Sequence, residues 1–219
     1  MIKNLIFDFD GVIVDTELLA AKSFSIVLKN MDIIYSAEDI AEKFSGHKMI
    51  QVTEDLSKIY KIGDKKIFLA KVMKIMNNYY KNDLTYVEKI NHFLNSIKCN
   101  FFICSNSGSQ RIIKGLEKVK LDHFFDKSKI YTFEHVLRPK PYPDVYLKVI
   151  NDNNLKKEET LVLEDSIAGV KAAVSANLNV VGITAASHWN NRSPQSLLDA
   201  GAFKIVNSYV NFENFLKKV

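Results

Sequence analysis

The amino-acid sequence predicts an α/β fold, in which helices flank a parallel β-sheet, with an all-helical segment inserted after the first strand. Three observations lead to this prediction. Short apolar runs are rich in Val, Ile and Phe and do not alternate strictly with polar residues, which is typical of strands covered on both faces. Helical patterns separate most of these runs, as in an open α/β fold. Between residues 16 and about 97, however, the alternation stops.

The apolar runs define the expected strands. They cover residues 4–9, 100–105, 129–133, 160–165, 179–184 and 203–207. The segments with helical spacing among them are 109–119, 143–153, 166–177 and 193–201. Pro143 and Pro194 fit the starts of two of these helices, because the fixed backbone angle of proline suits a first helical turn.

The segment that interrupts the alternation of strands and helices is predicted to consist of consecutive helices. Residues 16–30 and 64–80 place apolar side chains at helical spacing, and the stretch between them contains no convincing strand. Residues 87–97 read as a helix that belongs to the α/β part again. We therefore predict a core domain of residues 1–15 and 85–219 and an inserted helical domain of residues 16–84.

Composition narrows the class of protein. The 219 residues are 47% hydrophobic and 25% charged, as in an ordinary globular protein. No apolar run approaches the roughly 20 residues that span a bilayer, and no signal-peptide pattern opens the chain. We expect a cytoplasmic protein with no membrane partner. Cys99 and Cys104 are expected to be free thiols, since two cysteines make no disulfide framework in a chain of this length.

The formal charge of +5 does not predict nucleic-acid binding. The lysines are scattered among Ile and Asn without a long basic run, whereas nucleic-acid binding favours clustered basic side chains. We expect no nucleic-acid partner and a monomer. A positive balance also helps to attract small anionic substrates.

Acidic residues follow two of the predicted strands. In "LIFDFDGVIVDTE" (5–17) the first strand gives way to Asp8 and Asp10, and Gly11 then allows a close turn. "LVLEDS" ends similarly in Glu164 and Asp165. Ligands of open α/β sheets bind beyond the carboxyl ends of the strands. Because Mg²⁺ prefers carboxylate and carbonyl oxygens, these residues predict a Mg²⁺ site.

Two other strand ends supply groups that suit a phosphate. "FFICSNSGS" ends in Ser105 and Asn106, and a helix starts near Gly108, so hydroxyl, amide and helix-start N–H groups come together. Further along, Lys140 stands between two prolines. Because prolines restrict the local backbone, this lysine is predicted to be held in a defined direction.

These motifs, in this order, resemble those of the haloacid dehalogenase superfamily. They are DxDxxxxD from Asp8 to Asp15, the strand ending in Ser105, Lys140 before a proline-rich turn, and "EDS" from Glu164. The resemblance covers essentially the whole chain. It is closest to the subfamily with a helical cap inserted after the first motif, which includes β-phosphoglucomutase and many sugar-phosphate phosphatases. It implies a Rossmann-like core and a helical cap.

The resemblance also implies a mechanism. Asp8 would be the nucleophile that forms an aspartyl-phosphate, and Asp10 would be the general acid and then the general base. Mg²⁺ would be held by the Asp8 carboxylate, the Asp10 backbone carbonyl and Asp165. Glu164 would act either as a further ligand or through water. The dehalogenases of the superfamily lack the second aspartate, so Asp10 favours phosphate chemistry.

The remaining implied roles concern the phosphoryl group and the leaving group. Ser105 would hydrogen-bond a phosphoryl oxygen, Asn106 would assist by its backbone or side chain, and Lys140 would balance the negative charge. The segment "KFSGHKM" (43–49) matches the loop between cap helices that faces the active site in the family. His47 and Lys48 are therefore candidates for contacting the substrate, and a solvated loop lysine is the alternative for Lys48.

The function expected from this resemblance is that of a Mg²⁺-dependent phosphatase, a phosphoric monoester hydrolase acting on a sugar or sugar-acid phosphate. A β-phosphoglucomutase is an alternative, although "DTELLAAKSF" lacks the histidine that such mutases carry early in the first cap helix. A non-catalytic binding module is a second alternative, which the presence of every motif residue disfavours. The histidines show no metal-ligand spacing and are expected at the surface or core edge: His47, His92, His123, His135 and His188.

Overall fold

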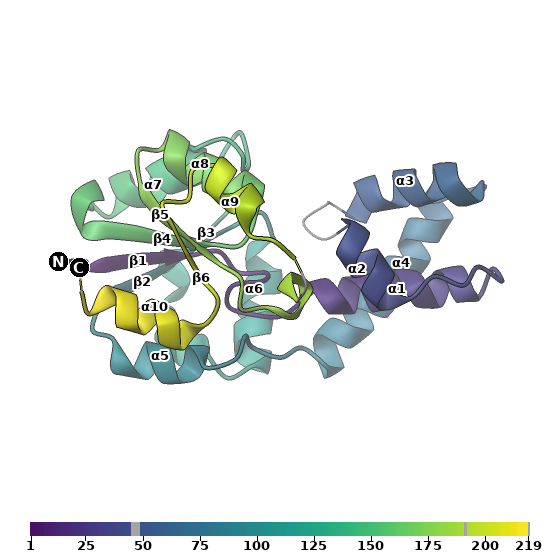
Figure 1. Ribbon diagram of the computed structural model, residues 1–219, viewed down its shortest axis with the longest axis horizontal. Helices are drawn as coiled ribbons and strands as arrows, with labels where there is room; N and C mark the ends of the chain where they lie inside the picture. The colour runs from purple at the N-terminus through teal and green to yellow at the C-terminus, as the bar shows by residue number, and fades with distance from the viewer. Residues whose placement is uncertain (45–48, 191, 219) are drawn as a thin grey trace. The chain divides into compact units, whose positions relative to one another are not determined.

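One parallel sheet forms the core of the α/β part of the computed structural model, which describes residues 1–44, 49–190 and 192–218 (Figure 1). Every pairing between neighbouring strands is parallel. The strands are β1 (Asn4–Phe7), β2 (Asn100–Ser105), β3 (Ile130–Thr132), β4 (Thr160–Glu164), β5 (Asn179–Ile183) and β6 (Lys204–Val206). Each of them falls within one of the apolar runs that predicted it, so the α/β fold class is confirmed.

The strand order places the first strand at the centre of the sheet. The order is β3-β2-β1-β4-β5-β6, so β1 lies between β2 and β4. The chain therefore proceeds outward in one direction through β2 and β3, and in the other through β4, β5 and β6. The carboxyl end of β1 is the point where this direction changes, which is where open α/β sheets bind their ligands.

Helices cover both faces of the sheet (Figure 1). On one face lie α7 (Asp144–Asp152), α8 (Ile167–Ser175) and α9 (Gln195–Asp199); on the other lie α5 (Ile90–Ser96) and α10 (Tyr209–Leu216). Alternate residues of β1 supply the two cores. Ile6 packs in the cluster that contains Tyr146 of α7 and Val170 of α8. Phe7 instead meets the ring of Phe93 on α5, with 6.4 Å between the ring centroids.

The described chain divides into two units. The core unit runs from Met1 to Val14 and from Tyr86 onward, and the helical unit is Asp15–Thr85. The helical unit contains α1 (Glu17–Lys29), α2 (Ala37–Phe44), α3 (Met49–Tyr60) and α4 (Lys65–Asn82). It has an apolar core of its own, to which Phe24, Leu56 and Val72 contribute. The side chain of Asp64 caps α4 by accepting the backbone N–H groups of the first turn.

The chain leaves and re-enters the core unit at one place. Val14 and Tyr86 form an antiparallel bridge, and the Val87 N–H donates to the Ile13 carbonyl at 2.9 Å. In the helical unit, the Asp15 N–H donates to the Thr85 carbonyl at 3.0 Å. The insertion thus begins and ends on paired stretches of backbone.

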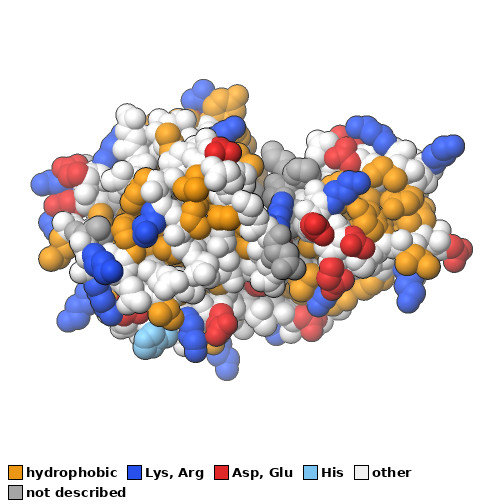
Figure 2. Space-filling view, in the orientation of Figure 1, with side chains coloured by type: hydrophobic (Ala, Val, Ile, Leu, Met, Phe, Trp, Pro, Cys, Tyr) orange, Lys and Arg blue, Asp and Glu red, His pale blue; other side chains and the backbone are white. Residues whose placement is uncertain are grey.

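Three features of composition and surface can be read from the structure. Cys99 and Cys104 are free thiols, as predicted. Within the described residues, no helix is both long enough and apolar enough to cross a membrane. On the face drawn in Figure 2, Lys and Arg side chains are dispersed among acidic and uncharged ones.

Candidate active site

The carboxyl ends of the three central strands bring most of the predicted core site residues together. Asp8 directly follows β1, Ser105 ends β2 and Glu164 ends β4. The Asp8 N–H donates to the Leu163 carbonyl at 3.0 Å, which continues the pairing of β1 with β4 beyond the last strand residue. Asp8 is therefore held in a fixed position at the centre of the sheet edge.

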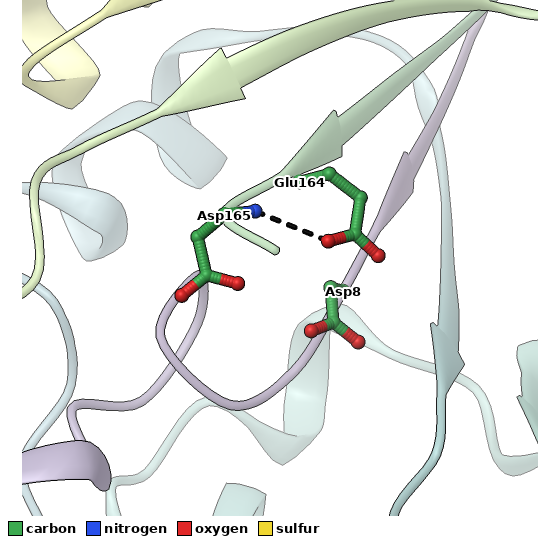
Figure 3. A group of neighbouring side chains, drawn as sticks. All are labelled: Asp8, Glu164 and Asp165. Atoms are coloured by element: carbon green, nitrogen blue, oxygen red, sulfur yellow. Dashed lines mark hydrogen bonds between the residues drawn. The ribbon is translucent and has the colours of Figure 1, made fainter. Parts of the chain in front are cut away.

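Asp8, Glu164 and Asp165 form a cluster of buried carboxylates (Figure 3). Each offers an oxygen atom that lies within 4.8 Å of those of the other two. Burial raises the pKa of Asp8 well above its ordinary value; Lys140 opposes this rise, and the charges of Glu164 and Asp165 add to it. Burial, followed by the charge of Glu164, raises the pKa of Asp165 in the same way. A further cation would relieve this concentration of negative charge.

The cluster fits a hard divalent cation. Its donors are all carboxylate oxygens, the type of ligand that Mg²⁺ prefers. Burial, together with the repulsion among the carboxylates, raises the pKa of Asp8 and Asp165, and a cation among them would offset both effects. The cluster is therefore a candidate site for a divalent cation.

Lys140 lies against the nucleophile candidate. Its Nζ donates to Asp8 Oδ1 at 2.9 Å, to Glu164 Oε1 at 2.5 Å and to the Cys104 carbonyl at 2.7 Å. Burial alone would lower the pKa of Lys140, but the neighbouring charges of Asp8 and Glu164 raise it above its ordinary value. The lysine is therefore a permanent positive charge, and all three of its ammonium hydrogens have an acceptor.

Glu164 is engaged by protein donors at both oxygens. Besides Lys140, Oε1 accepts the Tyr146 hydroxyl at 2.9 Å. Oε2 accepts the N–H groups of Asp165 and Ser166, each at 3.1 Å, and the Ser166 hydroxyl at 3.0 Å. Gly169 leaves the space for this carboxylate, since a Cβ there would overlap it. These contacts favour the second of the two predicted roles of Glu164, in which it acts on the metal indirectly.

The loop that carries Lys140 is tied to the loop after β2. Asn106 Oδ1 accepts the Lys140 N–H at 3.0 Å, and Asn106 Nδ2 donates to the Lys140 carbonyl at 3.0 Å. The side-chain amide of Asn106 therefore holds the lysine backbone. Of the two ways in which Asn106 was expected to contact a phosphate, the structure favours the backbone.

Asp10 has two partners from the segment after β2. Ser107 Oγ donates to Asp10 Oδ2 at 2.5 Å, and Arg111 Nη2 lies 3.3 Å from Asp10 Oδ1. Arg111 is on α6 (Ser109–Lys118), one face of which is buried. Neither Ser107 nor Arg111 was predicted as a site residue, although both follow the strand end that contains Ser105.

The start of α6 differs from the expectation. Its first N–H groups were expected to suit a phosphate, but the Ser109 N–H donates to Glu134 Oε2 at 2.9 Å, and the Ser109 hydroxyl donates to the same oxygen at 2.6 Å. Ser105 Oγ accepts the Ser107 N–H at 3.0 Å. A carboxylate of the protein thus already occupies part of this helix start. His47 and Lys48, the predicted substrate-contacting pair, lie outside the described residues.

His188 is a site residue that the sequence reasoning missed. It was expected at the surface or core edge, but its side chain is buried and its Nε2 lies 3.2 Å from Asp165 Oδ2. The signal that could have identified it is its position shortly after the strand β5, the neighbour of β4. The strand ends predicted to hold a metal are those with acidic residues. The strand end before His188 is followed by "TAASHW", which contains none.

Comparison with known proteins agrees with this arrangement of motifs. The chain is 21% identical over 192 residues to the 6-phosphogluconate phosphatase of Escherichia coli (strain K12), covering 85% of each chain. It is 27% identical over 209 residues to the "phosphorylated carbohydrates phosphatase" of Thermotoga maritima, covering 92% of this chain and 93% of the relative.

Solved structures show the same fold. One is a haloacid dehalogenase-like protein of unknown function from Agrobacterium tumefaciens str. C58, with a TM-score of 0.91 and 28% identity over 100% of this chain and 99% of the other. The sequence model of the haloacid dehalogenase-like hydrolases matches residues 5–183, a span that contains Asp8, Lys140 and Asp165. The resemblance noted in the sequence is thereby confirmed, and the chain belongs to the haloacid dehalogenase-like hydrolase family.

Proposed function

We propose that this protein is a Mg²⁺-dependent phosphatase that hydrolyses a small phosphorylated metabolite, a sugar or sugar-acid phosphate, through an aspartyl-phosphate intermediate. The observation that carries the proposal is the buried Asp8 carboxylate, with Lys140 Nζ 2.9 Å away and Asp165 in the same carboxylate cluster. A nucleophile, a fixed positive charge and a cation site at the switch point of the sheet are the parts that phosphoryl transfer requires.

In the first step, the Asp8 carboxylate attacks phosphorus, and the bond between phosphorus and the leaving oxygen breaks. Asp10 gives its proton to that oxygen, so that the metabolite leaves as a neutral alcohol rather than as an alkoxide. Lys140 lies beside Asp8 and balances the charge that develops on the phosphoryl oxygens. Ser105, at the end of β2, is the expected donor to one of these oxygens.

In the second step, water attacks the phosphorus of the Asp8 phosphoester. Asp10, now ionised, accepts a proton from the water, and the bond between phosphorus and the Asp8 oxygen breaks. Inorganic phosphate leaves, Asp8 is again a carboxylate and Asp10 is again an acid. The covalent intermediate divides one difficult displacement into two easier ones.

The Asp8 carboxylate, the Asp10 backbone carbonyl and Asp165 would hold the metal. The chemistry that Mg²⁺ supplies when bound is neutralisation of the negative charge shared by the nucleophile and the phosphoryl group. Glu164 supports the site by keeping Lys140 directed at Asp8, through the Nζ–Oε1 contact of 2.5 Å.

The proposed substrate class is based on the names of two relatives and on a lysine in the helical insertion, the proposed cap. Two relatives are named as phosphatases of 6-phosphogluconate and of phosphorylated carbohydrates. A lysine such as Lys48 would suit the carboxylate of a sugar acid, as the sequence predicts. We also retain the expectation of a monomeric cytoplasmic enzyme as part of the proposal.

The test is release of inorganic phosphate from a panel of sugar phosphates, sugar-acid phosphates, phosphoglycolate and nucleotides, with Mg²⁺ and with EDTA. We expect release from a few related members of the panel, dependent on Mg²⁺. Asp8→Asn removes the nucleophile and is expected to abolish release, whereas Asp152→Asn, on the exposed part of α7, serves as the matched control.

Three results would contradict the proposal. Undiminished release by Asp8→Asn would eliminate the aspartyl-phosphate route. Conversion of hexose 1-phosphates into hexose 6-phosphates without net phosphate release would favour the mutase instead. Absence of either activity, with a phosphorylated metabolite still bound, would favour the binding module.

A further inference from the structure

His188 connects a third strand end to the carboxylate cluster. It lies in the short 3₁₀ helix η5 (Ser187–Trp189), which follows β5. Its Nε2 is 3.2 Å from Asp165 Oδ2, and the two side chains are 4% and 6% exposed. Since Asp165 follows β4, the contact joins the ends of two neighbouring strands. A buried imidazole at this distance from a carboxylate is positioned to donate a hydrogen bond.

Gly11 makes room for this pair. Its φ of +80° is a left-handed conformation, and a Cβ there would overlap the Asp165 carboxylate and lie 3.1 Å from His188 Cε1. The loops after β1, β4 and β5 therefore converge on the carboxylate of one residue. Such an arrangement restricts how that carboxylate can rotate.

The turn around His188 is anchored in the core. The adjacent Trp189 belongs to the apolar cluster on the α7 and α8 face of the sheet, and its N–H donates to the Ala186 carbonyl at 3.0 Å. The imidazole and indole rings are 5.4 Å apart between centroids. His188 is consequently held by its backbone and its neighbour, independently of the cluster that it contacts.

We propose that His188 is a positioning residue for the metal site, a role that rests on the Mg²⁺ dependence of the proposed function. The Nε2–H group donates to Asp165 Oδ2 and holds the carboxylate in the orientation that presents its other oxygen to the cation. A carboxylate ligand already held by a hydrogen bond loses less rotational freedom when it binds a metal. Partners of this kind typically contribute about 10- to 100-fold to metal affinity.

The test measures Mg²⁺ binding directly, by isothermal titration calorimetry on the full chain without substrate. His188→Leu removes the donor and keeps an apolar side chain of similar bulk; we expect its dissociation constant to rise about 10- to 100-fold. His188→Gln places an amide N–H near the position of Nε2 and is expected to restore affinity to within a few-fold of the wild type. A purely structural role would not produce this rescue.

A control variant and a second measurement distinguish an effect on the metal site from a general loss of stability. His123→Leu makes the same substitution in the 3₁₀ helix η1 (Asp122–Phe124) at an exposed histidine, and should leave Mg²⁺ affinity unchanged. Trp189 is the only tryptophan of the chain and is adjacent to His188. Its emission should therefore change when Mg²⁺ is added to the wild type and report the same dissociation constant.

The outcomes distinguish this inference from the proposed function. If His188→Leu binds Mg²⁺ as tightly as the wild type, or if His188→Gln is as impaired as His188→Leu, the positioning role is wrong while the phosphatase stands. If the wild type binds no Mg²⁺ and releases phosphate without it, both proposals fail. Should His188→Leu not fold, His188→Asn replaces it, because its shorter amide does not reach the position of Nε2.

Discussion

Asp10 hydrogen-bonds Ser107 through one carboxylate oxygen and contacts Arg111 through the other. The proposed mechanism requires the same carboxyl group to exchange a proton with the leaving oxygen. Ser107 and Arg111 both come from the segment after β2, so the orientation of Asp10 depends on a part of the chain that is distant in sequence. A substitution of Asp10 alone tests the protonation step.

We predict that Asp10→Asn lowers kcat for a sugar phosphate by about 10²- to 10⁴-fold, because an amide cannot protonate the leaving alkoxide. In a single turnover with p-nitrophenyl phosphate the loss should be much smaller, since nitrophenolate is a stable leaving group. Rapid-quench kinetics measure both. Equal losses for the two substrates would show that Asp10 is not the general acid, and Asp152→Asn is the matched control.

Lys140 is the other residue whose removal has a defined consequence. It stands between Asp8 and Glu164 with its side chain 3% exposed, so its loss leaves buried carboxylates without their cation. We predict that Lys140→Met abolishes turnover and lowers the free energy of unfolding in EDTA by about 3–5 kcal/mol. Urea denaturation provides this measurement.

The matched control is Lys148→Met on α7. Lys148 pairs with Asp152 at 3.0 Å, but the two side chains are 38% and 40% exposed, so the expected change in unfolding free energy is about 0–1 kcal/mol. If Lys140→Met and Lys148→Met lowered the free energy of unfolding by similar amounts, the stabilising role assigned to the buried ion pairs of Lys140 would be contradicted.

At the scale of elements, the start of α6 depends on a residue from another element. Glu134 lies in the 3₁₀ helix η3 (Phe133–His135), after β3, and accepts the Ser109 N–H and hydroxyl. These hydrogen bonds, first from the Ser109 side chain and then from its backbone, lower the pKa of Glu134 below its ordinary value of 4.5. The ionised carboxylate is therefore the form that the folded state favours.

We predict that Glu134→Gln destabilises the protein at neutral pH and that the difference from the wild type disappears in acid. A carboxyl group whose pKa is lowered by folding stabilises the native state above its unfolded pKa, and this contribution is lost as the pH falls through the folded pKa. Urea denaturation between neutral and acidic pH tests the prediction. Glu158→Gln, at an exposed position of η4 (Lys157–Glu159), is the control. If the difference in unfolding free energy between Glu134→Gln and the wild type did not change with pH, the prediction would be contradicted.

At the scale of the whole molecule, the insertion has its own core and a paired entry and exit. Residues joined by an antiparallel bridge, such as Val14 and Tyr86, have Cα atoms about 5 Å apart. A connection of about two residues can span that gap. The helical unit is thus removable, in principle, without stretching the backbone of the core unit.

We predict that a chain in which two glycines join Val14 to Tyr86 folds cooperatively and binds Mg²⁺ with near-normal affinity. It should release phosphate slowly and discriminate poorly among the members of the substrate panel, because the cap is proposed to recognise the leaving group. Circular dichroism, calorimetry and the phosphate assay test these points. Preserved discrimination would place specificity in the core unit instead.

The local pattern of the chain was sufficient to predict the strands and the acids that follow them. Runs such as 160–165 are apolar on both faces, a property that each segment carries by itself. The motif order from Asp8 to Asp165 can likewise be read from the sequence, because Asp8, Ser105 and Asp165 each lie at or directly after a strand end. The fold class and most of the chemical groups were therefore accessible without coordinates.

Side-chain contacts between residues that follow different strands could not be predicted from the sequence in the same way. Asn106 with Lys140, Ser109 with Glu134, and Asp165 with His188 join residues that are 34, 25 and 23 positions apart. Ser109, Glu134 and His188 look unremarkable in their own segments, and no local pattern pairs Asn106 with Lys140. His188 in particular shows no ligand spacing, because its role depends on the order of β4 and β5 in the sheet.

The sequence by itself determined which elements form, which strand ends carry carboxylates and a serine, and that a lysine stands between two prolines, since hydrophobic pattern and residue type are local properties. The tertiary structure decided which oxygen each donor contacts: Glu164 with Lys140, Asp10 with Arg111, Asp165 with His188. The physical reason is that burial makes each polar group require a partner, and only the packed arrangement of strands determines which partner lies within hydrogen-bonding distance.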